Sequence, residues 1–251
     1  LEPLDDYFKD SMLERDVLAP ALMEAGTYEG KLYSVPMSFA TLAMHYNKDH
    51  FKETGLDSEK APVTIEELST VWKKLLKVDA AGNVEQYPQA IGVKSTVPMV
   101  PVFLWDFGAD IVTSTNKSGL ASPNAIEAMK FLQNAFVNDR ISPVGLTGQE
   151  ADNLFAAGKA SIEWNGPWVI NGFRNAGIDL GIAEVPAGPA GRFTYGGENV
   201  LVISKDSKAK KEAWKFLEYW NSKEAQKYWT LTVAFPPTRI DMLSDPDIAK
   251  N

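Results

Sequence analysis

Apolar residues recur at helical spacing in the segment 64–78. Thr64 opens it and Glu67 follows three positions later, which is the pattern of a capping box. The apolar positions are Ile65, Leu68, Trp72 and Leu75. This spacing predicts an amphipathic helix that buries one face.

Two further segments carry the same helical pattern. The segment 122–138 begins with Ser122-Pro123, an N-cap followed by proline at the first helical position. Its apolar face is predicted to comprise Ile126, Met129, Leu132 and Phe136. The segment 207–221 is predicted to turn one set of residues inward, namely Ala213, Phe216, Leu217 and Trp220. Its lysines, at 208, 210, 211 and 215, form the solvated face.

Short β-type runs lie between and around these helices. They are Leu42–Tyr46, Ala90–Val93, Ala160–Trp164, Ile178–Ile182 and the continuous apolar run Val200–Ile203, which predicts a buried strand. Strands interleaved with helices predict an α/β fold with largely parallel sheets. A dense group of prolines and glycines at 186–191, followed by Gly196-Gly197, predicts a chain crossing or hinge near 186–199.

Composition limits the class of protein. With 251 residues and 45% hydrophobic side chains, the chain can build a large core, and its length falls between one domain and two. The net charge of −8 argues against nucleic acid as a partner. No stretch has the length of a bilayer span, and no secretory signal follows Leu1, so we expect a processed, trimmed or truncated chain. The absence of cysteine excludes thiol catalysis, cysteine-ligated zinc and disulfides.

Motifs of catalysis are absent from the sequence. The two histidines, His45 and His50, are five residues apart, which does not fit a metal pair on a helix, and the apolar run around His45 favours a packed side chain. Nucleophile elbows, dinucleotide fingerprints and phosphate-binding loops are also absent. We therefore expect no catalytic residue, no metal site and no cofactor. A pair of carboxylates of the glycosidase type stays open, because 33 acidic residues always offer pairs.

Two tryptophans bracket the turn Asn165-Gly166-Pro167. Trp164 ends a predicted strand and is interpreted as a core residue, whereas Trp168 follows the turn and is poorly placed for a core. Ligands of open α/β sheets bind outside the carboxyl ends of strands. We expect Trp168 to stack on a ligand ring, with Asn165 and the amide of Gly166 supplying hydrogen bonds.

Other candidate contacts are less specific. Gly196-Gly197 is either a simple turn or a place where backbone approaches a ligand, with Glu198 and Asn199 as polar groups beside it. Trp105 and Phe39 are each either packed or in contact with ligand.

An ordered set of motifs resembles the family-1 extracellular solute-binding proteins of ABC importers. The set begins with Tyr28–Pro36, His45–Lys48 and Phe51–Leu56, and continues with Leu154–Ser161, Asn165–Trp168, Gly196-Gly197 and Glu212–Leu217. The maltose-binding members carry the same Asn-Gly-Pro-Trp, and there the tryptophan stacks on a sugar. The resemblance therefore implies this role for Trp168.

The resemblance also implies a fold and a division into lobes. The family has the type II periplasmic-binding-protein architecture, with two α/β lobes joined by a hinge. It implies that 1–38 and 200–251 form lobe one, that 39–42 and 195–199 are hinge crossovers and that 43–194 form lobe two. Family members continue beyond both ends of this sequence, so lobe one is expected to be incomplete.

The function implied by the resemblance is binding without chemical turnover. We expect a sugar or oligosaccharide ligand, membrane permease subunits of an ABC importer as partners, a monomer, and a location at the extracellular face of the membrane, lipid-anchored, or in the periplasm. One alternative is a glycerol-phosphate-type binder, which the double glycine and Ser38 would tolerate and for which Arg239 is the candidate cation. The other is a carbohydrate-active enzyme in which Glu198 acts as acid or base.

Overall fold

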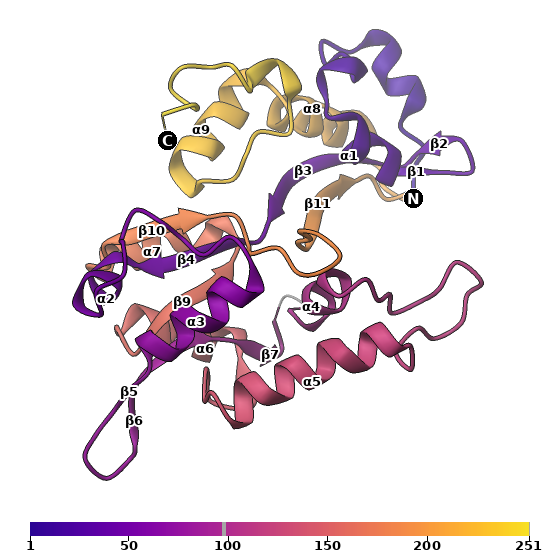
Figure 1. Ribbon diagram of the computed structural model, residues 1–251. Coiled ribbons are helices and arrows are strands. Elements are labelled where there is room, and N and C mark those ends of the chain that lie inside the picture. The colour runs from indigo at the N-terminus through magenta and orange to yellow at the C-terminus, as the bar shows by residue number, and fades with distance from the viewer. Residues whose placement is uncertain (97–98, 251) are drawn as a thin grey trace. The chain divides into compact units, whose positions relative to one another are not determined.

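The computed structural model describes residues 1–96 and 99–250 (Figure 1). Contacts divide the chain into a discontinuous unit, Leu1–Ala40 with Gly196–Asn251, and a continuous unit, Thr41–Tyr195. The two divisions, after Ala40 and after Tyr195, fall within the segments 39–42 and 195–199 that the resemblance implies as crossovers.

The continuous unit contains a five-stranded sheet in the order β10-β4-β9-β6-β5. Its strands are β4 (Ala43–Asn47), β5 (Lys77–Val78), β6 (Val84–Ala90), β9 (Ala160–Asn165) and β10 (Leu180–Ala183). Only β6 and β9 are parallel, while β4 is antiparallel to both of its neighbours and β5 is antiparallel to β6. The prediction of largely parallel sheets is wrong for this unit. The connection from β6 to β9 contains the helices that a parallel pair requires, whereas β5 and β6 are joined by a short turn.

Helices cover this sheet, and both predicted capping residues stand at the starts of their helices. They are α2 (Lys48–Glu53), α3 (Ile65–Leu75), α4 (Val100–Asp106), α5 (Pro123–Val137), α6 (Gly148–Ala156) and α7 (Ile170–Asn175). The side chains of Thr64 and Ser122 accept hydrogen bonds from the amides of Glu67 and Ala125, so both predicted N-caps are confirmed. A capping box of Thr147 and Glu150 starts α6, which the sequence analysis missed.

The helix α5 buries only part of its predicted face. Its buried residues are Ala125, Ala128, Leu132 and Ala135. Ile126 and Met129, which were predicted to lie inward, are exposed. Ala125 and Ala128 pack against Leu104 of α4, while the predicted Leu132 and Phe136 contact the main core.

The two faces of the central strands differ. Tyr46 of β4 and Trp164 of β9 lie in the main core with Trp72 and Phe103, and the rings of Trp164 and Phe103 stack with centroids 4.8 Å apart. Trp164 is therefore a core residue, as predicted. Side chains alternate along a strand, so His45 and Glu163 point to the opposite face. That face carries α6 and α7, since Phe173 of α7 meets the ring of His45.

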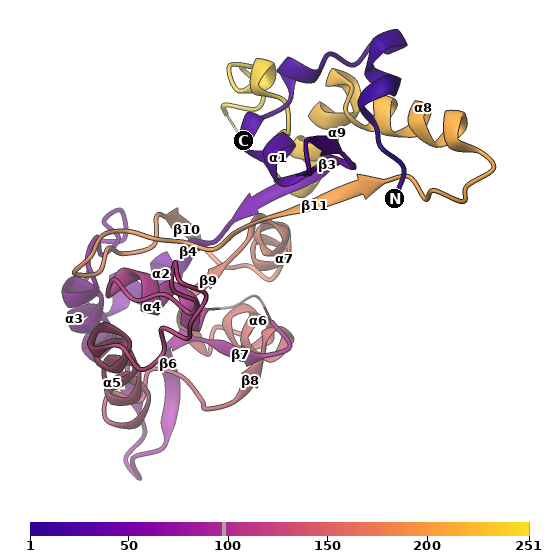
Figure 2. The same cartoon turned by 90° about the vertical axis from the view of Figure 1, so that its right-hand side faces the viewer.

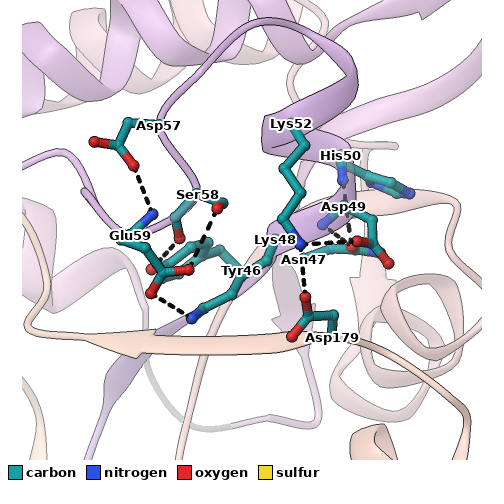
Figure 3. A network of polar contacts seen from close by, with 10 residues as sticks. All are labelled: Tyr46, Asn47, Lys48, Asp49, His50, Lys52, Asp57, Ser58, Glu59 and Asp179. Atoms are coloured by element: carbon teal, nitrogen blue, oxygen red, sulfur yellow. Dashed lines mark hydrogen bonds and ion pairs between the residues drawn. The ribbon is translucent and has the colours of Figure 1, made fainter.

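A polar network fixes α2 beside the edge of this sheet (Figure 3). The side chain of Asn47 caps α2 by accepting hydrogen bonds from the amides of Asp49 and His50. Lys52 then reaches Asp179, the residue before β10, at 2.9 Å. The network lies at the surface, so its ion pairs contribute little individually to stability.

The discontinuous unit is built from two segments that meet in one small sheet. β3 (Ser34–Thr41) and β11 (Gly196–Val202) are neighbours in it, as Figure 2 shows. The remaining elements are η1 (Asp5–Asp10), η2 (Arg15–Val17), α1 (Pro20–Ala25), β1 (Thr27–Tyr28), β2 (Lys31–Leu32), α8 (Lys210–Trp220), α9 (Lys223–Val233) and η4 (Ile240–Met242). Trp214 and Leu217 of α8 join a core with Leu4, Leu18 and Ile203.

Three further predictions, for β11, for α8 and for the run Ala90–Val93, need correction. Val200 and Val202 are 41% and 43% exposed, so the run Val200–Ile203 is not buried on both faces. Leu201 and Ile203 pack into the core of the discontinuous unit, and the alternate side chains lie on the uncovered face. Phe216 of α8 is exposed, and Trp214, which was not predicted, takes its place in the core. The run Ala90–Val93 is divided between the end of β6 and the start of a separate strand, β7 (Gly92–Lys94), which pairs with β8 (Leu146–Thr147).

Candidate functional site

The strand β9 ends at a turn that presents an aromatic ring. All six residues of β9 are buried, and the chain leaves the strand through Gly166 into the short helix η3 (Pro167–Val169). Trp168 is 42% exposed. Its indole lies so close to Gly166 that a Cβ atom there would overlap the ring, which is why glycine is required. Trp168 thus stands at the carboxyl end of a central strand, where the sequence analysis places it.

The side chain of Asn165 is engaged within the unit. Its Nδ2 donates to Oδ1 of Asp152 at 2.8 Å and to Oε1 of Glu163 at 3.0 Å. Its Oδ1 accepts the amide of Gly166 at 2.9 Å. Only 7% of Asn165 is exposed. Both amide hydrogens therefore already have acceptors, and the hydrogen bond to a ligand that the sequence analysis expects would have to displace one of them.

Glu163 is a buried carboxyl group that sequence reasoning missed. It is 3% exposed, and burial raises its pKa well above the ordinary value, with a further contribution from hydrogen bonding to Asp152. Its Oε2 has no hydrogen-bond partner among the described residues. Its position in the sequence could have revealed it. Glu163 lies between Ile162 and Trp164, whose side chains face the main core, so its own side chain must point to the opposite face of the strand.

His45 lies directly across from Glu163 in the pairing of β4 with β9. It is 1% exposed, and burial lowers its pKa to about 4, so the imidazole is neutral at pH 7. Neither ring nitrogen has a hydrogen-bond partner among the described residues. The prediction that His45 is a packed histidine is confirmed.

Trp105 and Asp106 close the helix α4. Trp105 is partly buried and packs against the main core, which favours the packed alternative left open for it. Asp106 is fully buried: its Oδ1 accepts the amide of Phe193 at 3.1 Å, and its carbonyl oxygen accepts the amide of Ala190 at 2.9 Å. Burial raises the pKa of Asp106 to about 6. Asp106 therefore anchors the loop that precedes Gly196.

Candidate residues of the discontinuous unit lie on β3 and β11. Ser38 and Phe39 belong to β3, and the amide of Asn199 on β11 donates to the hydroxyl of Ser38 at 3.1 Å. Gly196 and Gly197 begin β11, so the simple-turn alternative for this pair is wrong.

Glu198 of β11 is partly buried. Burial raises its pKa, and its Oε2 has no hydrogen-bond partner among the described residues. This oxygen is itself buried, so a ligand hydroxyl reaches it only if the side chain of Glu198 turns outward.

Arg239 is already paired within the discontinuous unit. Its guanidinium donates two hydrogen bonds to the carboxylate of Asp241, at 2.9 and 2.8 Å, and one to the carbonyl of Asn221 at 2.9 Å. The pairing lowers the pKa of Asp241 to about 2. A guanidinium committed to a carboxylate is a poor candidate for binding a phosphate.

Neither a metal site nor a membrane-spanning helix is found among the residues that the structure describes. Among residues 1–96 and 99–250, no group of three or more histidine, aspartate or glutamate side chains is arranged to hold a metal ion. None of the helices described in those ranges has the length and apolarity needed to cross a bilayer.

Comparisons with known proteins agree on one family. The family described as bacterial extracellular solute-binding protein matches residues 1–227. A Brucella abortus (strain 2308) protein, whose name describes it only as a binding protein, is 31% identical over 94% of this chain and 57% of its own length. The maltotriose-binding protein of Pyrococcus abyssi is 29% identical over 99% of this chain and 52% of its own length.

Solved structures share the fold. Maltose-bound MalE3 of T. maritima matches with a TM-score of 0.84 and 27% identity, covering 100% of this chain and 65% of the other. The chain therefore spans about half to two thirds of the length of these relatives.

Proposed function

The chain belongs to the family of bacterial extracellular solute-binding proteins, and from this membership and the geometry of the Asn165–Trp168 turn we propose that it binds a carbohydrate without chemically changing it. The observation that carries the proposal is Trp168, a 42% exposed indole at the carboxyl end of β9. The face of an aromatic side chain packs against the apolar face of a sugar ring, while the hydroxyl groups of the sugar hydrogen-bond to polar groups of the protein.

Binding is proposed to proceed by closure of two lobes. A sugar contacts Trp168 on the continuous unit and then polar groups of β3 and β11, among which Glu198 and Asn199 are the candidates. A ligand shifts the equilibrium toward closure only if it binds the closed state more tightly than the open one. The segments 39–42 and 195–199 are the proposed hinges, and 1–38 with 200–251 and 43–194 are the proposed lobes.

Delivery and location complete the proposal. The closed complex docks as a monomer on the permease subunits of an ABC importer, at the extracellular face of the membrane, lipid-anchored, or in the periplasm. The named relatives support a carbohydrate, since they include a maltotriose-binding and a maltose-bound protein.

The glycerol-phosphate alternative loses support from the geometry of Arg239. Its guanidinium would have to leave Asp241 to bind an anion. A neutral sugar makes no such demand, so we retain the carbohydrate as the proposed ligand class.

Titration calorimetry against a panel of mono- and oligosaccharides tests the proposal. We expect saturable binding to at least one sugar, and Trp168→Ala to weaken that affinity by roughly 1–3 kcal/mol, which corresponds to a loss of about 5- to 150-fold. Tyr228→Ala provides a matched control, because Tyr228 is an exposed aromatic residue at a position on α9 that the proposal does not use. Equal affinities in the two variants would exclude Trp168 from the site.

Product analysis tests the enzymatic alternative. A solute-binding protein returns the ligand unchanged after long incubation. Released product that disappears in Glu198→Gln would show catalysis and overturn the proposal.

A further inference from the structure

The side chain of Asn165 has no free hydrogen-bonding group to offer a ligand. Both hydrogens of its amide are used, by Asp152 and Glu163, and its oxygen is used by Gly166. A side chain that is fully hydrogen-bonded and only 7% exposed is better suited to hold neighbouring protein groups in place than to bind a solute.

We propose that the partly buried Asp152 and the buried Glu163 together hold Asn165, position Trp168 through Asn165 and Gly166, and so set the affinity of the site without touching the ligand. The proposal rests on the proposed function only for its effect on sugar affinity, because the contacts that hold the turn can be tested without a sugar.

The first link is the placement of Asp152 on α6. The capping box of Thr147 and Glu150 fixes where α6 starts, and α6 packs against β9. Asp152 therefore approaches β9 from a helix whose position is set by local sequence, and its Oδ1 meets the amide of Asn165 at 2.8 Å.

The second link is the charge state of the pair. Two carboxylates that accept from one amide nitrogen are close, and two negative charges cannot share a buried site at low cost. Burial, together with the neighbouring Asp152, raises the pKa of Glu163 and so favours its neutral, protonated form. One proton thereby lets both carboxyl groups face the same amide.

Other ionisable groups near the pair do not replace this proton. The elements packed against β9 carry Glu150 on α6, Glu85 and Tyr87 on β6, and His45 and Tyr46 on β4, and α7, which contacts α6, carries Arg174. Asp152 is the only one of the ionisable groups on these elements that contributes to the raised pKa of Glu163. Burial keeps His45 neutral, and Glu150 is occupied in the capping box.

The third link runs from Asn165 to the ring. The Oδ1 of Asn165 holds the amide of Gly166 at 2.9 Å, and the indole of Trp168 lies over the Cα of Gly166. Movement of Asn165 therefore moves the surface on which Trp168 rests. The position of the exposed ring depends on groups that lie inside the unit.

Hydrogen exchange at residues 163–169, followed by mass spectrometry without any sugar, tests the chain of contacts directly. In Glu163→Ala we expect exchange in this segment to rise by about tenfold or more, because the amide of Asn165 loses one of its two acceptors. Glu163→Gln should keep exchange within about twofold of the unmodified protein, since glutamine offers both an acceptor and a donor in the same shape.

The matched control is Gln86→Ala. Gln86 is buried in the same sheet and bonds to the carbonyl of Leu75 and the hydroxyl of Ser161, with no contact to the turn. It should lower the melting temperature of the protein without raising exchange at 163–169. Equal exchange at 163–169 in Glu163→Ala and Gln86→Ala would reduce Glu163 to a general stabilising residue and overturn the proposal.

Sugar affinity provides the second measurement. Glu163→Ala should weaken binding by about 5-fold or more, with Glu163→Gln restoring it and Gln86→Ala leaving it unchanged. Unchanged affinity in Glu163→Ala, in a protein that does bind sugar, would contradict the positioning role. A protein that binds no sugar would refute the proposed function alone, because the exchange experiment still decides whether the carboxyl pair holds the turn.

Discussion

In the discontinuous unit the buried polar residues Asn221, Gln226 and Thr238 are neutral and bonded to one another or to backbone. In the continuous unit His45 and Asp106 are buried and ionisable, and each keeps at least one atom without a partner among the described residues. The first arrangement resembles the interior of any stable fold, where buried polar groups are satisfied. The second carries a free-energy penalty that depends on pH.

This difference in buried polar groups suggests different roles: the neutral network of the discontinuous unit supports the fold, whereas the ionisable groups of the continuous unit surround the candidate site. Neutral, satisfied networks hold segments in place at every pH. Desolvated ionisable groups gather where function requires shifted pKa values, and those of the continuous unit lie near the Asn165–Trp168 turn and the loop before Gly196. Glu198 is the exception in the discontinuous unit, and it is itself a candidate ligand contact.

The largest effect is expected from Asn221→Ala. Its side chain accepts from the hydroxyl of Thr238 and donates to the carbonyl of Leu217, and it is fully buried. Loss of these bonds and the resulting cavity should lower the free energy of unfolding by about 2–4 kcal/mol. Chemical denaturation should give the same loss at pH 5 and at pH 8. A loss that changes with pH would break the contrast between the two interiors.

A pH-dependent effect is expected from His45→Leu. The pKa of His45 is lowered to about 4, so the unfolded chain takes up a proton between pH 6.5 and pH 4 that the folded chain does not. The stability of the unmodified protein should therefore fall by up to about 3 kcal/mol as pH falls through this window. His45→Leu should remove that part of the fall, measured by denaturation at intervals of half a pH unit. Parallel curves for the two proteins would contradict the prediction.

The opposite sign is expected from Asp106→Asn. The pKa of Asp106 is raised to about 6, so the folded chain holds a proton between pH 4 and pH 6 that the unfolded chain has lost. Stability should thus fall as pH rises through this window, by about 1–2 kcal/mol when the effect is discounted for incomplete desolvation. Asp106→Asn should abolish this fall and leave the His45 effect in place. Additive behaviour of the double variant would show that the two groups act independently.

The smallest effect is expected from Asp241→Asn. Hydrogen bonding to Arg239 lowers the pKa of Asp241 to about 2, so the pair stabilises the folded state above pH 4 and loses that contribution as pH falls toward 2. The carboxylate is partly exposed, so the loss at pH 7 should be about 0.5–1 kcal/mol. Thermal unfolding at pH 7 and pH 3 measures it, and a larger loss at pH 3 would reverse the expected sign.

Local features of the fold follow from the sequence. Thr64 and Ser122 cap the helices that their patterns predict, because a capping side chain needs only the next few residues. Trp164 and Trp168 are distinguished by their positions before and after a turn. The ordered motifs, taken together, indicate the family and hence the two-lobe α/β fold, since the family match covers residues 1–227.

Features that depend on distant packing do not follow from it. The buried face of α5 is set by its packing against α4 and the main core, and the hydrophobic pattern favoured the larger side chains. The exposed valines of β11 reflect which face of the strand is covered by the core. The role of Asn165 depends on Asp152 and Glu163, whose approach requires α6 to be docked on β9. Periodicity along one segment contains none of this information.

The strand β9 has a consequence for the order of folding. It begins at Ala160, yet its two neighbours end at Asn47 and Ala90, so a long loop must close before either ladder forms. The turn that carries Trp168 should therefore form late, after the helices that rely on local contacts. The sheet of β3 and β11 must wait longer still, because the whole continuous unit lies between them in the chain. During synthesis, β3 emerges early without its partner and is the segment most in need of protection from misplaced pairing.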